Sequence, residues 1–80
     1  MTRKFDDATI ERWKVLADKR LATLGHTRAD VKTGRDAWSF AHMCGITNEA
    51  YRDRNANDAH IKTALASVFP NAVFSDKYRY

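Results

Sequence analysis

Residues 6–25, with the sequence DDATIERWKVLADKRLATLG, carry the clearest structural pattern in the chain. They predict a helix over about residues 8–24, because Asp6 and Asp7 place hydrogen-bond acceptors and negative charge at its start. Gly25 follows, and glycine readily adopts the left-handed conformation that ends a helix. Apolar residues recur at helical spacing for about four turns and define a buried stripe. The predicted stripe consists of Ile10, Trp13, Leu16, Ala17, Leu21 and Leu24.

Three further helices are predicted downstream by apolar spacing and by residues that cap helix ends. They cover about residues 34–44, 48–54 and 58–69. Thr33 and Asp36 have the spacing of a capping box before the second helix, and Thr47 is a suitable cap for the third. Asn55 or Asn57 can cap the fourth helix through a side-chain oxygen.

Two segments fall outside these helices. The connector over residues 26–33 has room for one extra helical turn between Thr27 and Asp30. The tail, residues 70–80, begins at Pro70 and loses helical spacing, so we expect it to be extended. An extended segment needs a neighbouring strand, and the sequence offers no convincing second one. The tail is therefore expected to lie across the helices or to pair with a second copy of the chain.

The composition fits a single domain. The chain has 80 residues with only three Gly and one Pro, and it is rich in residues that favour helices. We therefore predict an all-α fold, a small bundle of about four helices with an extended C-terminal tail. A chain of this size buries only about 60% of the surface that its unfolded form exposes. This argues against a large multistep enzyme with a deep cavity.

The positive charge of the chain is unevenly distributed. There are 14 Lys and Arg residues against 10 Asp and Glu, a formal net charge of +4. Residues 1–35 hold 9 basic against 5 acidic residues, residues 36–54 hold 2 against 3, and residues 55–80 hold 3 against 2. The excess thus lies in the first helix and its connector. A moderate positive charge is compatible with a polyanionic partner but does not by itself identify one.

The sequence has no pattern of catalytic or metal-binding residues. Cys44 is the only cysteine, so it cannot form an internal disulfide, and we expect it to be a small core residue. His42 and Cys44 are two positions apart and fall on different faces of a helix, which disfavours a metal site. Gly25, Gly34 and Gly45 are too far apart for a phosphate-binding loop. We expect no enzymatic activity, no metal and no cofactor.

The expected compartment follows from the apolar pattern. The first residues, MTRKFDDATIERW, carry charges where a secretory signal needs an unbroken apolar run. No stretch approaches the roughly 18 consecutive apolar residues of a membrane-spanning helix. A single cysteine is typical of proteins in a reducing compartment. We therefore expect a cytoplasmic protein that does not enter a membrane.

Residues 40–51, FAHMCGITNEAY, resemble the helix-turn-helix of phage and bacterial transcription regulators. That family has a small residue four positions before a turn Gly, then an aliphatic residue, a polar cap and, six positions after the Gly, a large apolar residue. The small residue lets two helices cross closely, the Gly accepts the geometry of the turn, and Ile46 and Tyr51 are expected to be buried and to hold the second helix against the first. The resemblance covers residues 37–56 and departs from the family at Arg54, where an apolar residue is usual. The matching residues are Ala41, Gly45, Ile46, Thr47 and Tyr51.

The resemblance implies a helix-turn-helix corner that binds double-stranded DNA. Asn48 can pair with an adenine edge, Arg52 with a guanine edge, and Glu49 can accept from a cytosine amino group. Because one reading helix contacts only a handful of base pairs, the resemblance also implies a homodimer. The positions that would face the major groove are Thr47, Asn48, Glu49, Arg52 and Asp53. Phosphate contacts would come from Lys32, Arg35, His42 and Arg54, with Lys77 and Arg79 in the tail.

The tail is the second informative segment. It ends in Tyr78, Arg79 and Tyr80, two aromatic rings around a cation. This composition suits the surface of a partner or a nucleic-acid backbone, so we predict that these residues bind a partner. Val73 and Phe74 are expected to pack as a strap over the helices of the same domain.

A function of a different class stays open. The chain also fits a small helical protein-interaction module, for instance a phage-encoded inhibitor that binds a host protein or a nucleoprotein complex. Such a protein accommodates acidic residues on the third helix, and the charged first helix can dock on an acidic partner. The first-helix cations are Arg12, Lys14, Lys19 and Arg20. Salt dependence separates the two functions, because binding to DNA phosphates weakens by orders of magnitude as salt rises.

Overall fold

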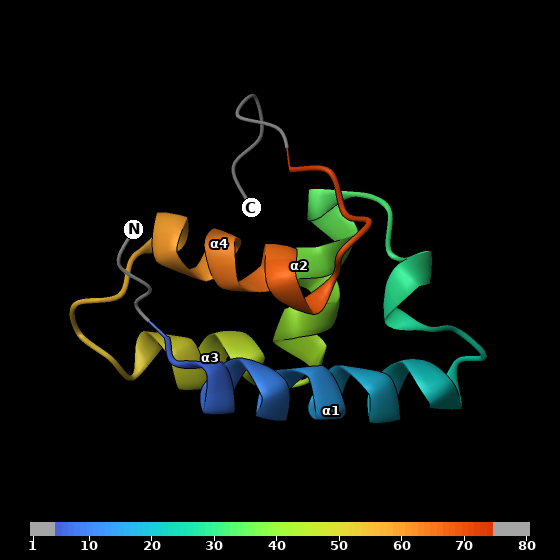
Figure 1. Ribbon diagram of the computed structural model, residues 1–80, viewed down its shortest axis with the longest axis horizontal. Helices are drawn as coiled ribbons and strands as arrows, with labels where there is room; N and C mark the ends of the chain where they lie inside the picture. Colours follow the sequence, from blue (N-terminus) through green and yellow to red (C-terminus); the bar gives the residue numbers. More distant parts are fainter. Residues whose placement is uncertain (1–4, 75–80) are drawn as a thin grey trace.

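The computed structural model describes residues 5–74 and has the predicted all-α fold. Within these residues, four α-helices and one short 3₁₀ helix follow one another along the chain (Figure 1). Their bounds are α1 Asp7–Thr23, η1 Arg28–Asp30, α2 Gly34–Met43, α3 Ile46–Tyr51 and α4 Asp58–Val68. No helix in this part of the chain is long and apolar enough to cross a membrane.

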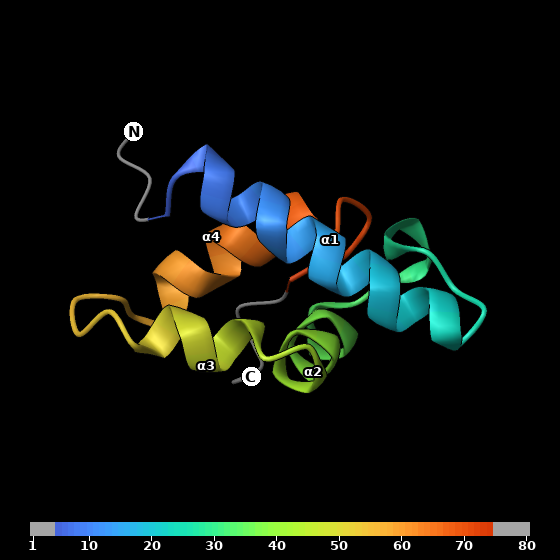
Figure 2. The same cartoon turned by 90° about the horizontal axis from the view of Figure 1, so that it is seen from below.

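The helices α1 and α4 form the centre of the bundle. They pack side by side and run in the same general direction (Figures 1 and 2). Helix α2 stands across them and contacts both α3 and α4, while η1 packs against α1. From the lower end of α2 in Figure 1, α3 runs back toward the start of α1. This arrangement places α3 at one end of the molecule and η1 at the other.

Every α-helix contributes to the core. Trp13 is fully buried, and the ring of Phe5 meets it edge-on with 4.8 Å between ring centroids. The predicted stripe of the first helix is confirmed at Ile10, Trp13, Ala17 and Leu21, whereas Leu24 is 51% exposed because the helix ends at Thr23 and the chain turns away. The other large, fully buried side chains are Ile46, Ile61, Leu65, Val68 and Phe69.

The predicted caps of three helices are confirmed. The Asp6 carboxylate accepts a hydrogen bond from the backbone N–H of Thr9, 2.8 Å away, at the start of α1. The Thr33 hydroxyl accepts from the N–H of Asp36 at 3.1 Å before α2. Asn57 caps α4, with its side-chain oxygen 3.0 Å from the N–H of His60. Each of these bonds satisfies a backbone donor that the helix itself leaves free.

The predicted bounds of the third helix are wrong at both ends. We expected about residues 48–54 with Thr47 as the cap, but α3 spans Ile46–Tyr51 and its N-cap is Gly45. The carbonyl of Gly45 accepts from the N–H of Glu49 at 3.1 Å, so the first helical bond forms two residues earlier. The helix then ends early because the Asp53 carboxylate accepts from the N–H of Asn55, which forms a turn instead.

The tail pairs with the connector, a partner that was not predicted from the sequence. Val73 forms a parallel bridge with Thr33 of the connector: its carbonyl accepts from Gly34 N–H at 2.8 Å and its N–H donates to the Lys32 carbonyl at 3.0 Å. Phe74 packs against the core as expected of a strap, whereas Val73 is 74% exposed. The predicted extra turn of the connector is present as η1. The predicted partner-binding residues Tyr78, Arg79 and Tyr80, and the cation Lys77, lie outside the described residues.

Candidate nucleic-acid interface

The corner between α2 and α3 is made by two residues. After Met43, Cys44 ends α2 with its N–H donating to the Phe40 carbonyl at 2.9 Å, and Gly45 follows with φ +79°. A Cβ added to Gly45 would meet nothing within 4 Å, so the position favours glycine because of its left-handed backbone and not because of crowding. The turn is therefore tight, and α3 starts directly after the glycine.

Small residues let the two helices pack closely. Ala41 of α2 and Ile46 and Ala50 of α3 are completely buried. The prediction that Tyr51 is the large buried residue of the corner is wrong, because its side chain is 50% exposed. The inward residues of α3 are Ile46, Thr47 and Ala50, and Tyr51 lies outside this buried set.

Tyr51 instead links α3 to the start of α4. Its hydroxyl donates a hydrogen bond to the Asp58 carboxylate, with 2.5 Å between the oxygens. This bond, together with the negative charge of Asp58, raises the pKa of the Tyr51 hydroxyl above its ordinary value. The ring remains half exposed beside the loop that joins the two helices.

Thr47 does not face outward as the resemblance implied. It is 5% exposed, and its hydroxyl lies 3.4 Å from Nδ1 of His42 on the preceding helix. The earlier start of α3 turns this residue toward α2 instead of toward solvent. Thr47 therefore belongs to the packing of the corner and is not available to contact a base.

Glu49 is also occupied within the protein. Its carboxylate oxygen Oε2 accepts hydrogen bonds from the indole N–H of Trp13, at 2.7 Å, and from the guanidinium of Arg12. The Glu49 side chain is 29% exposed, so it is not oriented freely into solvent. These two bonds tie α3 to α1, and they engage Oε2 of Glu49 within the protein.

The role of Arg12 and Trp13 at this site was missed by the sequence analysis. A buried indole N–H nearly always needs an acceptor, which is the signal that Trp13 carried. No local pattern around Trp13 selects Glu49 as that acceptor, because the two residues are 36 positions apart.

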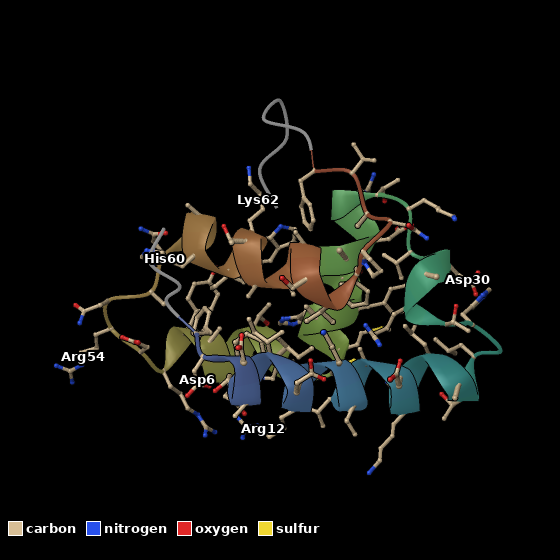
Figure 3. All side chains as sticks on the ribbon, viewed as in Figure 1. Asp6, Arg12, Asp30, Arg54, His60 and Lys62 are labelled. Carbon is tan, nitrogen blue, oxygen red and sulfur yellow. The ribbon has the colours of Figure 1, made fainter. Side chains whose placement is uncertain are left out.

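The exposed predicted residues fall into two groups. At the corner lie Asn48, Arg52 and Arg54, with His42 at the end of α2. Lys32 and Arg35 are also exposed, but they lie at the other end of α2. A helix of 10 residues is about 15 Å long, so these two cations do not join the corner group. Figure 3 shows Arg54 on the loop beyond α3, pointing away from the bundle.

We use the name α3 surface for the exposed side chains at the corner end of the molecule. Asn48 and Arg52 are separated by four positions and so lie one above the other on the helix. Arg52 is the C-cap of α3 and keeps a helical backbone conformation. The α3 surface consists of Asn48, Tyr51, Arg52 and Arg54. It offers an amide, a guanidinium pair and an aromatic ring to a partner.

The described residues do not favour a reactive thiol or a metal site. Partial burial raises the pKa of the Cys44 thiol, which disfavours the reactive thiolate. In the part of the chain that the structure describes, no group of three or more His, Cys, Asp or Glu side chains is arranged to hold a metal ion.

Comparisons with known proteins do not add to this picture. The chain gives no significant match to a protein-family model, to a curated protein or to a solved structure.

Proposed function

We propose that this chain is a small DNA-binding regulator of the phage or plasmid type, which presents α3 to the major groove. The observation that carries the proposal is the position of Asn48 and Arg52. Both are exposed and lie one turn apart on a short helix that is fixed by the Gly45 corner and by the bond between Glu49 and Trp13. A rigid support for exposed polar side chains is what base recognition requires.

The chemistry of these two side chains suits base edges. An Asn amide can form two hydrogen bonds with adenine, and an Arg guanidinium can form two with guanine. Helix α3 has 6 residues and is therefore about 9 Å long, so one copy contacts few base pairs. Specific binding on this scale is expected to need two copies on a symmetric site. A homodimer in a cytoplasmic setting is thus part of the proposal.

Phosphate contacts are assigned to polar side chains around the corner. Arg54 and His42 are exposed next to α3, and we assign to them the phosphates of the strand that borders the groove. Lys32 and Arg35 lie about one α2 length away, so they would contact a different part of the duplex backbone. These contacts would provide affinity without sequence preference, while Asn48 and Arg52 would provide the preference.

The proposal is tested by selection from a pool of random duplex DNA. The wild-type chain is expected to bind the pool at ~50 mM salt, to lose affinity steeply as salt rises, and to enrich a sequence motif. The double variant Asn48→Ala with Arg52→Ala is expected to lose the motif while its thermal transition stays nearly unchanged. Lys62→Gln is the matched control, because Figure 3 shows Lys62 on the side of α4 away from α1.

Failure of the wild-type chain to bind duplex DNA at low salt would contradict the proposal. Enrichment of the same motif by the double variant would contradict the assignment of Asn48 and Arg52. Loss of the motif in the Lys62→Gln control would show that general positive charge, and not the α3 surface, determines binding.

A second candidate is a small helical protein that binds and inhibits a host protein. It is supported by apolar side chains that are about half exposed on several elements. These are Val15 at 52%, Leu24 at 51% and Met43 at 45%. Binding through such apolar side chains depends only weakly on salt concentration. Binding to phosphates, by contrast, weakens strongly as salt concentration rises. The salt titration of the preceding experiment therefore distinguishes the two candidates.

A further inference from the structure

Arg12 reaches α3 from a different helix. Its guanidinium donates to Oε2 of Glu49, the same oxygen that accepts from the Trp13 indole at 2.7 Å. The Arg12 side chain is 57% exposed even with this bond in place. Figure 3 shows Arg12 on the side of α1 that faces away from α4. A cation of α1 is thus held next to Glu49, a neighbour of Asn48 in the chain.

We propose that Arg12 is a phosphate contact that α1 supplies beside the α3 surface, a role that rests on the proposed DNA-binding function. A guanidinium has five N–H donors in a planar fork. The bond to Glu49 is made through one nitrogen, Nη2, and more than half of the side chain stays exposed. Donors therefore remain for a phosphate oxygen, and the guanidinium geometry suits phosphate well.

The pairing also changes the charge next to α3. Glu49 is an acid on the helix that would approach phosphates, and its charge alone would repel them. Arg12 balances this charge at the point where it occurs. With Arg52 and Arg54, Arg12 brings a third guanidinium to this end of the molecule.

Docking of α3 does not require Arg12. Trp13 is fully buried and already occupies the Glu49 carboxylate with its indole N–H. An ion pair with one partner more than half exposed adds little to stability. The removal of the Arg12 charge is therefore expected to change DNA binding while leaving the fold intact.

The test measures binding to random duplex DNA as a function of salt for a set of variants. Arg12→Gln is expected to lower affinity about tenfold at ~50 mM salt and to reduce the slope of log affinity against log salt by about one. Arg12→Lys keeps the charge and is expected to keep the wild-type slope. Lys62→Gln is the matched control for loss of one positive charge and is expected to leave the slope unchanged.

A double variant, Arg12→Gln with Glu49→Gln, separates direct contact from neutralisation. Gln at position 49 keeps an oxygen for the Trp13 indole, and the double variant leaves no unpaired acid. A slope that stays reduced by about one supports a direct phosphate contact. A slope restored to the wild-type value overturns it, because neutralisation of Glu49 would then explain the whole effect.

Failure of this inference is distinguishable from failure of the proposed function. If the wild-type chain shows no salt-dependent binding, the DNA-binding function itself is wrong. If the wild-type chain binds and the Asn48 and Arg52 variant loses its motif, but Arg12→Gln keeps the wild-type slope, only the role of Arg12 is wrong.

Discussion

The end of the molecule around η1 and the end around α3 are held in different ways. At the η1 end, Arg28 donates to the Asp18 carboxylate at 2.7 Å and to the Val68 carbonyl at 3.0 Å, which joins α1 to the end of α4. The Asn71 amide also donates to the Ala29 carbonyl, and Val73 pairs with the connector through the backbone. These bonds connect the 3₁₀ turn to two helices and to the tail.

The α3 end is held by hydrogen bonds between side chains. Glu49 accepts from α1, and Tyr51 donates to Asp58 at the start of α4. That end also carries the exposed polar side chains of Asn48, Arg52 and Arg54. The comparison indicates that the η1 end is joined to the rest of the domain partly through backbone groups, while the α3 end is joined through side chains and presents exposed polar residues. Three predictions test this division.

The largest expected effect is at Arg28. Arg28→Ala removes two hydrogen bonds that involve a charged donor, one of them to a backbone carbonyl of α4. We expect a loss of about 2 kcal/mol in the free energy of unfolding, measured by urea denaturation. Arg12→Gln is the matched control at the α3 end and is expected to cost about 0.5 kcal/mol or less. If the two variants lost equal free energy of unfolding, the proposed difference between the η1 end and the α3 end would be refuted.

A smaller loss in the free energy of unfolding is expected at the two glycines with positive φ. Gly25, with φ +77°, precedes η1, and Gly45, with φ +79°, forms the corner. Neither position is crowded, so replacement by Ala at either site is expected to cost about 1 kcal/mol, from backbone strain alone. The two variants should differ in DNA binding, which only Gly45→Ala is expected to weaken. A loss of binding with Gly25→Ala would mean that the η1 end also takes part.

The smallest effect concerns the Tyr51 hydroxyl. The bond to Asp58 raises the pKa of Tyr51 above the ordinary value of 10.0. The bond therefore contributes its full stability below pH 10, and the contribution is lost as the pH rises through the folded-state pKa. Urea midpoints of wild type and Tyr51→Phe are expected to differ at pH 8 and to converge at strongly alkaline pH. A constant difference across this range would show that the bond does not respond to ionisation.

Much of the fold could be predicted from local sequence signals. Asp6, Thr33 and Asn57 each mark a helix start, because a short polar side chain can satisfy backbone donors whatever the tertiary structure. Gly25 marked the end of α1 for a similar local reason, since its left-handed conformation is open to glycine.

The residue at which α3 begins, and therefore which of its side chains face inward, could not be predicted in the same way. Thr47 is a suitable cap and also a suitable small buried residue, so its sequence position alone does not choose between the two roles. The choice depends on the packing of Ile46 and Ala50 against α2, which is a tertiary contact. Of the predicted site residues, Asn48, Arg52 and Arg54 are exposed, whereas Thr47 is buried and Glu49 bonds to Arg12 and Trp13.

The pairing of Val73 with the connector bears on the order in which the chain folds. The bridge joins Thr33 to Val73, which are 40 positions apart (73 minus 33), and the segment between them contains α2, α3 and α4. During synthesis the corner at Gly45 leaves the ribosome well before Val73, and contacts between neighbouring segments close faster than distant ones. We therefore expect the contacts around the Gly45 corner to form before the bridge between Thr33 and Val73 closes the opposite end of the domain.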